Sequence, residues 1–150
     1  MRTVIQRVKK AVVTVDDKVT ASMGTGLLLL VGIEEDDTLE DAEWLARKVS
    51  QMRIFNDEKG VMNLSVCDIS GDIIVVSQFT LHARTRKGNR PSYINAASPE
   101  KAIPLYNQFI EILESLTGRS VGRGIFGAMM QVELINDGPV TLIIDTRAKE

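Results

Sequence analysis

Stretches of β-branched and aliphatic residues, separated by polar turns, make up most of the chain and predict strands. Residues 2–8 and 11–15 are β-branched and partly alternate with polar residues, which is typical of half-buried strands. A turn at residues 16–18 leads to a returning strand at residues 19–22. The apolar run 26–33 is bounded by glycine and acidic residues, so it predicts a strand buried on both faces in the middle of a sheet.

Two amphipathic helices interrupt the predicted strands. The first begins at Thr38, which can cap with Asp41, and ends near Arg53. The second has Ser98 as its N-cap, followed by a proline, and ends at Thr117-Gly118. Further strands are predicted at residues 61–66, 73–78, 130–136 and 140–145. Short connections favour antiparallel pairing, so we predict a mixed α and β fold in one domain, residues 1–150.

The composition fits a globular protein. Of the 150 residues, 44% are hydrophobic and 25% are charged, which excludes intrinsic disorder. No apolar run is long enough for a membrane span, and the N-terminal residues do not have the pattern of a signal peptide. We therefore expect a cytoplasmic protein without a membrane partner. With one cysteine, Cys67, and one histidine, His82, neither a disulfide nor a zinc site is expected, and no metal or cofactor is predicted. A catalytic triad would have to use His82, and no GxSxG or HExxH motif is present.

The net charge of −2 conceals an uneven distribution of charge. Two segments, residues 73–99 and 115–132, contain no acidic residue. Together they carry six cationic side chains: Arg84, Arg86, Lys87, Arg90, Arg119 and Arg123. Such segments can focus a positive field on one face, which suits a ligand with phosphates, although a solvated basic loop is the alternative.

Two motifs differ from an ordinary scaffold. Residues 77–81, Ser-Gln-Phe-Thr-Leu, place hydrogen-bonding side chains at the end of a buried strand, where ligand binding or simple exposure to water can satisfy them. Residues 136–141, Asn-Asp-Gly-Pro-Val-Thr, contain a hairpin signal at Asp-Gly. Pro139 removes an N–H donor where the return strand begins, and a cis Gly-Pro bond is plausible there. A cis unit would hold carbonyl oxygens that can accept hydrogen bonds from an ammonium group.

Together these motifs resemble the D-aminoacyl-tRNA deacylase family over essentially the whole chain. The resemblance rests on residues 1–8, 77–81, 87–92, 127–130 and 136–141. It implies a barrel-like pair of largely antiparallel sheets with helices packed on one side, in three β-β-α layers, and a homodimer. It also implies hydrolysis of the ester bond of D-aminoacyl-tRNA and of mischarged glycyl-tRNA, with L-amino acids rejected.

The resemblance assigns roles to particular residues. The pocket for the 3′-terminal adenosine and the aminoacyl ester would be formed by Ser77, Gln78, Phe79 and Thr80. Gly138 and Pro139 would enter the active site of the partner subunit, where their carbonyl oxygens exclude an L side chain. Arg7 would hold this element in place across the dimer. For tRNA binding, the candidates are the cations of the basic loop: Arg84, Arg86, Lys87 and Arg90.

The chemistry at Thr80 follows from its neighbours. A threonine without a base is a weak nucleophile, and His82 would point to the opposite face of a continued strand. We therefore expect no acyl-threonine intermediate, but a positioned water, the backbone amides of Phe79 and Thr80, and the 2′-hydroxyl of the substrate. His82 is expected at the surface or near a phosphate, and the core is expected to hold Phe126, Met129 and Met130. A non-catalytic dimeric tRNA-binding module and a small-molecule D-amino-acid esterase are the alternatives.

Overall fold

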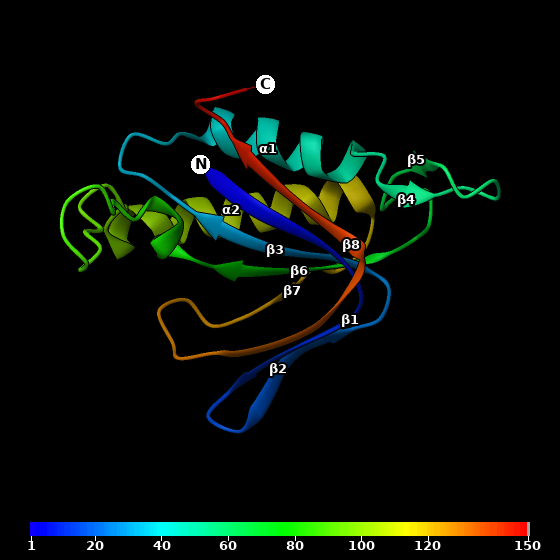
Figure 1. Ribbon diagram of the computed structural model, residues 1–150, viewed down its shortest axis with the longest axis horizontal. Coiled ribbons are helices and arrows are strands. Elements are labelled where there is room, and N and C mark those ends of the chain that lie inside the picture. Colours follow the sequence, from blue (N-terminus) through cyan, green and yellow to red (C-terminus); the bar gives the residue numbers. More distant parts are fainter. Residues whose placement is uncertain (150) are drawn as a thin grey trace.

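One long antiparallel pair of strands organises the sheet in this computed structural model, which describes residues 1–149 (Figure 1). β1 (Arg2–Val15) pairs with β8 (Gln131–Asp145) along nearly its whole length. The opposite edge of β1 pairs first with β3 (Gly26–Gly32) and then with β2 (Lys18–Met23), both antiparallel. β1 therefore lies inside the sheet and changes one partner halfway along its length.

Two parallel strands extend the sheet beyond β3. β6 (Asp72–Ser77) pairs with β3, and the short β7 (Gly122–Arg123) pairs with β6. These two parallel pairs are exceptions to the expected antiparallel pairing, because their connections cross over through helices. The strand order is β2-β1-β3-β6-β7, with β8 on β1, and the sheet curls into a nearly closed barrel-like shape (Figure 1).

Two helices cover one face of the sheet (Figure 1). α1 (Leu39–Gln51) and α2 (Pro99–Thr117) pack together and bury the larger hydrophobic core against the sheet. A smaller core lies between the strands of the barrel. Two short strands, β4 (Phe55–Asn56) and β5 (Met62–Leu64), form a separate sheet after α1. The expected β-β-α layering is confirmed. Within residues 1–149, no helix is long and apolar enough to cross a membrane.

The strongest local signals of the sequence are confirmed. Alternate side chains of β3 enter different cores: Leu27 and Leu29 pack under the helices, whereas Leu28 packs inside the barrel. All three are at most 1% exposed, as expected for a strand buried on both faces. Before α1, the backbone N–H of Thr38 donates to Oδ2 of Asp41 at 3.0 Å, which is the predicted cap.

Two predicted strand assignments in the first half of the chain are wrong. Residues 2–8 and 11–15 form one strand rather than two. Lys9 and Lys10 are exposed at an irregularity in the pairing with β8, which breaks the alternation of buried residues without ending the strand. Only the middle of the predicted strand 61–66 is paired, as β5, because a turn follows it.

Candidate active site

The end of β6 leads into a single 3-10 turn, η1 (Phe79–His82), which carries the candidate catalytic residues. The backbone N–H of Gln78 donates to the carbonyl oxygen of Val31 at 2.7 Å, which ties the start of the turn to β3. The N–H of Leu81 donates back to the Gln78 carbonyl at 3.2 Å and closes the turn. The strand therefore ends at Ser77, and the turn determines where the next side chains point.

The Thr80 hydroxyl has an amide neighbour and no base. Nε2 of Gln78 donates to Oγ1 of Thr80 at 2.6 Å. Among residues 1–149, no carboxylate or imidazole forms a hydrogen bond with this hydroxyl. Without a base the hydroxyl is a weak nucleophile, so the geometry favours a role for Thr80 in binding or orienting a reacting group.

Phe79 connects the turn to the loop that follows it. Its side chain is 55% exposed and meets Tyr93 edge-on, with ring centroids 5.0 Å apart. In the described part of the chain, no hydrogen bond is made by the backbone N–H groups of Phe79 and Thr80, as expected at the start of a helical turn. These two donors are therefore available to a ligand. Sequence reasoning missed Tyr93, although an aromatic residue in a basic loop is a usable signal.

The basic loop after η1 forms an open cavity of about 740 Å³. Its lining consists of Arg84, Thr85, Arg86, Lys87 and Ser92. Two backbone hydrogen bonds between Arg84 and Ser92, of 2.8 and 3.0 Å, close the loop. No ion pair within residues 1–149 involves a cation of this loop. The positive charges of this cavity, which we call the basic groove, are therefore available to an anion.

The second acid-free segment does not add to this charge. Arg119 pairs with Asp72, and Arg123 lies 3.6 Å from Glu114. Both acidic partners come from outside the segment, so folding neutralises its cations. The positive field predicted from the sequence is thus concentrated at the basic groove.

His82 lies inside the protein, and the prediction of a surface position is wrong. Its side chain is 1% exposed and lies beside Gly32, where an added Cβ would be only 2.8 Å from the ring. Nδ1 of His82 is 3.4 Å from Oε1 of Glu34. The prediction fails because β6 ends before His82, so that η1 carries the ring against β3 instead of continuing the alternation of a strand.

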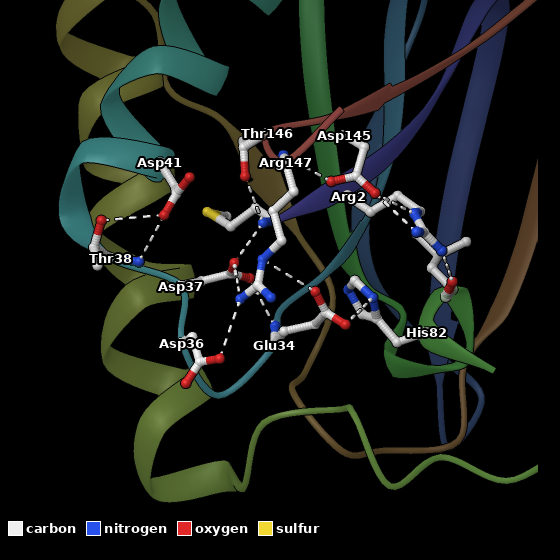
Figure 2. A network of polar contacts seen from close by, with 12 residues as sticks. Arg2, Glu34, Asp36, Asp37, Thr38, Asp41, His82, Asp145, Thr146 and Arg147 are labelled. Atoms are coloured by element: carbon white, nitrogen blue, oxygen red, sulfur yellow. Dashed lines mark hydrogen bonds and ion pairs between the residues drawn. The ribbon is translucent and has the colours of Figure 1, made fainter. Parts of the chain in front are cut away.

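Glu34 connects His82 to a network of charged groups, seen in Figure 2. Nε of Arg147 lies 3.3 Å from Oε2 of Glu34, and Nη2 of Arg147 lies 3.4 Å from Oδ1 of Asp37. The ammonium group of Met1 lies 2.7 Å from the same Asp37 oxygen, and both of these groups are fully buried. The network links η1 to residues far away in sequence, which is why no local motif indicates it.

The motif at residues 136–141 is a bulge within β8 and not the predicted hairpin turn. Pairing with β1 stops at Asn136 and resumes at Thr141, with the chain continuing in the same direction. The strands predicted on either side are therefore one strand, because the unpaired residues interrupt the ladder without reversing the chain. The Gly138–Pro139 peptide bond is cis, and both residues are exposed.

Arg7 and Asn136 hold this bulge in place. The Arg7 side chain is almost completely buried and donates from Nε to the Asp137 carbonyl at 3.0 Å and from Nη1 to the Ile54 carbonyl at 2.6 Å. The Asn136 side chain accepts from the Val140 N–H at 3.0 Å and donates to the Val140 carbonyl at 3.2 Å. Arg7 thus contacts the bulge within its own chain, and a contact across a dimer stays a prediction.

The motifs at residues 77–81 and 136–141 lie at opposite ends of β6. Asp137, next to Gly138, lines a cavity of about 600 Å³ together with Asp72, the first residue of β6. Thr80 lies beyond the last residue of the same strand. A strand of six residues spans about 17 Å. The bulge of one chain is therefore too far from η1 to contact Thr80 of that chain.

Three residues of the loop between β7 and β8 differ in how far they are buried. Phe126 packs against Tyr106 with ring centroids 5.8 Å apart, and Met130 packs on the barrel core, as expected. Met129 is 91% exposed, so the expected core position is wrong for this residue.

Burial raises the pKa of Tyr106 to about 12, so its hydroxyl stays neutral. This hydroxyl donates to the Val75 carbonyl, which gives Tyr106 a structural role. Within residues 1–149, no cluster of acidic, histidine and cysteine side chains is arranged to hold a metal ion.

Known proteins resemble the chain in sequence over its whole length. The sequence profile of a family described as D-Tyr-tRNA(Tyr) deacylase matches residues 4–145. A protein of Flavobacterium psychrophilum named D-aminoacyl-tRNA deacylase is 61% identical over 150 residues, which cover 100% of both chains. A protein of Akkermansia muciniphila with the same name is 60% identical with the same coverage.

Solved structures resemble the fold. One, named c-Myc DNA Unwinding Element Binding Protein, has a TM-score of 0.90 and 40% sequence identity, and the match covers 97% of this chain and 98% of that chain. Another, of a probable eukaryotic D-amino acid tRNA deacylase, has a TM-score of 0.83 over 95% of this chain and 97% of that chain. At 17% identity the second comparison supports the fold alone. From the profile match and the full-length relatives, it follows that the chain belongs to the D-Tyr-tRNA(Tyr) deacylase family.

Proposed function

We propose that the chain removes D-amino acids, and mischarged glycine, from the 3′ end of tRNA in the cytoplasm. Family membership makes it a carboxylic ester hydrolase that acts on aminoacyl-tRNA. The observation that carries the finer proposal is the position of two free backbone donors, at Phe79 and Thr80, next to the basic groove. Free N–H groups can stabilise the oxyanion of ester hydrolysis, while cationic side chains hold the phosphates of an RNA end.

The proposed chemistry uses a positioned water and no covalent intermediate. Gln78 donates to Oγ1 of Thr80, which leaves the hydroxyl proton of Thr80 free to bind the substrate or the water. His82 faces Glu34 in the interior and does not serve as the base. Water attacks the ester carbonyl, and the N–H groups of Phe79 and Thr80 stabilise the tetrahedral oxyanion. The bond to the ribose 3′-oxygen then breaks, and the proton given up by the water passes to this oxygen with help from the neighbouring 2′-hydroxyl. Because aminoacyl esters are already labile, positioning and charge stabilisation are sufficient.

Chiral selection requires a second copy of the chain. In the proposed site a partner subunit supplies Gly138 and Pro139, and the separation of the bulge from η1 at opposite ends of β6 within one chain supports this arrangement. In such a homodimer their carbonyl oxygens accept hydrogen bonds from the substrate ammonium and occupy the space of an L side chain. Arg7 and Asn136 support the bulge from its own chain, which favours a stiff wall. A stiff wall rejects the mirror image because it cannot rotate away.

Matched D- and L-aminoacyl-tRNA test the proposed function. We expect release of the D-amino acid and of glycine, while the L-aminoacyl ester persists. Binding of tRNA without release would instead indicate a non-catalytic tRNA-binding module. Equal hydrolysis of D-amino-acid esters with and without tRNA would indicate a small-molecule esterase.

Mixed dimers test the contribution of the partner subunit. A Gln78→Ala subunit is defective on the η1 side, and a Gly138→Val subunit is defective at the bulge, where the positive φ of 133° and the nearby Arg7 side chain leave no room for valine. In a mixed dimer, one of the two sites combines an intact η1 with an intact bulge. We expect this site to recover selective hydrolysis of the D form, and no recovery would overturn the arrangement in trans.

A further inference from the structure

We propose that Arg2 is a positioning residue for the reaction, because its guanidinium clamps the end of η1 to the paired ends of β1 and β8. The proposal rests on the proposed function, which places the reacting groups on η1. Arg2 belongs to neither candidate motif, and it lies 79 residues from its contact in η1.

The clamp consists of three contacts made by one side chain. Nη1 of Arg2 donates to the carbonyl oxygen of Leu81 at 2.7 Å. Nε and Nη2 of Arg2 lie 2.9 and 2.8 Å from Oδ2 of Asp145. Figure 2 shows Arg2 facing Asp145. Arg2 and Asp145 are also direct partners in the pairing of β1 with β8, so both residues of the clamp belong to the two longest strands of the sheet.

The end of η1 needs support from outside the turn. η1 has only four residues, and after it the Ala83 N–H donates to the Thr80 carbonyl at 3.1 Å. Short 3-10 turns have poorer hydrogen-bond geometry than α-helices, so contacts with the rest of the protein determine where such a turn lies. Leu81 is bonded directly to Thr80, so a displacement of Leu81 also displaces the backbone of Thr80. A cation at the C-terminal end of a helical turn is also electrostatically favourable.

Asp145 keeps the guanidinium in this orientation. The side chain of Asp145 is 16% exposed and that of Arg2 is 37% exposed. Burial alone raises the pKa of Asp145, but hydrogen bonds from the Arg147 N–H and the Arg2 guanidinium together lower the pKa below its ordinary value. The carboxylate is therefore charged at neutral pH. A lysine at position 2 would keep the charge, but its single ammonium group cannot hold both partners in the fork geometry of arginine.

Two variants test the clamp by kinetics: Arg2→Gln and Arg2→Lys. With D-aminoacyl-tRNA we expect kcat to fall by about 10- to 100-fold in Arg2→Gln, because a displacement approaching 1 Å in a site costs this much, while KM changes little. The kcat of Arg2→Lys is expected to lie between those of wild type and Arg2→Gln. Arg47→Gln is the matched control, since it removes an exposed ion pair with Glu43 on α1, and it should keep the wild-type kcat.

Hydrogen exchange separates positioning from a general loss of stability. In Arg2→Gln and Asp145→Asn we expect faster exchange of the Leu81 and Ala83 amides, which close η1. The Gly118 amide donates to the Glu114 carbonyl at 2.9 Å at the C-terminal end of α2, and it should exchange as in wild type. Unchanged exchange in η1, equally faster exchange at Gly118, or a kcat within about twofold of wild type would each overturn the proposal. A wild-type protein without deacylase activity would instead refute the proposed function, and the exchange of η1 would still decide the clamp.

Discussion

Replacing Gly32 with alanine tests whether the packing of His82 determines the position of η1. An added Cβ at Gly32 would lie 2.8 Å from Cδ2 of His82, 2.9 Å from Nε2 and 3.0 Å from the carbonyl oxygen of Gln78. Carbon atoms in contact prefer separations of about 3.5–4.0 Å, so the ring must move by about 0.7 Å. Gly32 has no positive φ, so the conflict is steric and not conformational.

The ring has little space in which to move. The His82 side chain is 1% exposed, and Glu34 lies 3.4 Å from its Nδ1. Overpacking of such a site costs about 1–3 kcal/mol, and each kcal/mol lowers the Tm of a domain of this size by about 2–4 °C. Because His82 and Thr80 belong to the same turn, η1 shifts with the ring. A displacement approaching 1 Å reduces kcat by up to about 100-fold.

Urea unfolding and single-turnover deacylation measure the two effects of Gly32→Ala. Gly24→Ala is the matched control, because a Cβ there meets no atom within 4 Å, and its stability should stay within about 0.5 kcal/mol of wild type.

Combining Gly32→Ala with His82→Ala tests the cause. Without the ring the added methyl group meets less resistance, so the double variant should be more stable than the summed effects of the single changes predict, by about 0.5–3 kcal/mol. A Gly32→Ala protein with wild-type Tm and kcat would refute the reasoning. Additivity of the two changes within about 0.3 kcal/mol would refute it as well.

Three further changes address other parts of the molecule. Thr80→Val should keep a measurable fraction of kcat, because the backbone donor remains, whereas complete loss with normal tRNA binding would point to a catalytic hydroxyl. Asp37→Asn leaves the buried Met1 ammonium without its carboxylate and should lower the free energy of unfolding in urea by about 3–5 kcal/mol; a loss below about 1 kcal/mol contradicts the pairing. Lys87→Gln should reduce the slope of log Kd for tRNA against log salt by about one, and an unchanged slope excludes a phosphate contact.

Elements marked by neighbouring residues could be predicted from the sequence. The cap at Thr38 depends on a side chain three residues away, and the burial of β3 on both faces depends on a continuous apolar run. The start of α2 after Ser98 and its end at Gly118 follow from a proline and a glycine. In each case the residues that determine the structure lie within one turn or one strand, where alternation and capping rules apply.

Elements that depend on distant partners could not be predicted in this way. The motif around Pro139 contains the signal of a hairpin, but pairing with β1 on both sides of it keeps β8 a single strand. His82 is buried because Gly32, fifty residues earlier, leaves space for its ring. Neither outcome is encoded in the few residues on either side.

The sequence by itself determined the chemical groups of the candidate site: hydroxyl and amide side chains after a buried strand, cations without nearby acids, and a Gly-Pro pair. The tertiary structure decided how these groups lie relative to one another. It ended β6 before Thr80, placed the Gly138–Pro139 bulge at the opposite end of that strand, and brought Arg2 to η1. The reason is physical, because strand register and close packing depend on residues far apart in the chain, whereas capping and side-chain alternation depend on near neighbours.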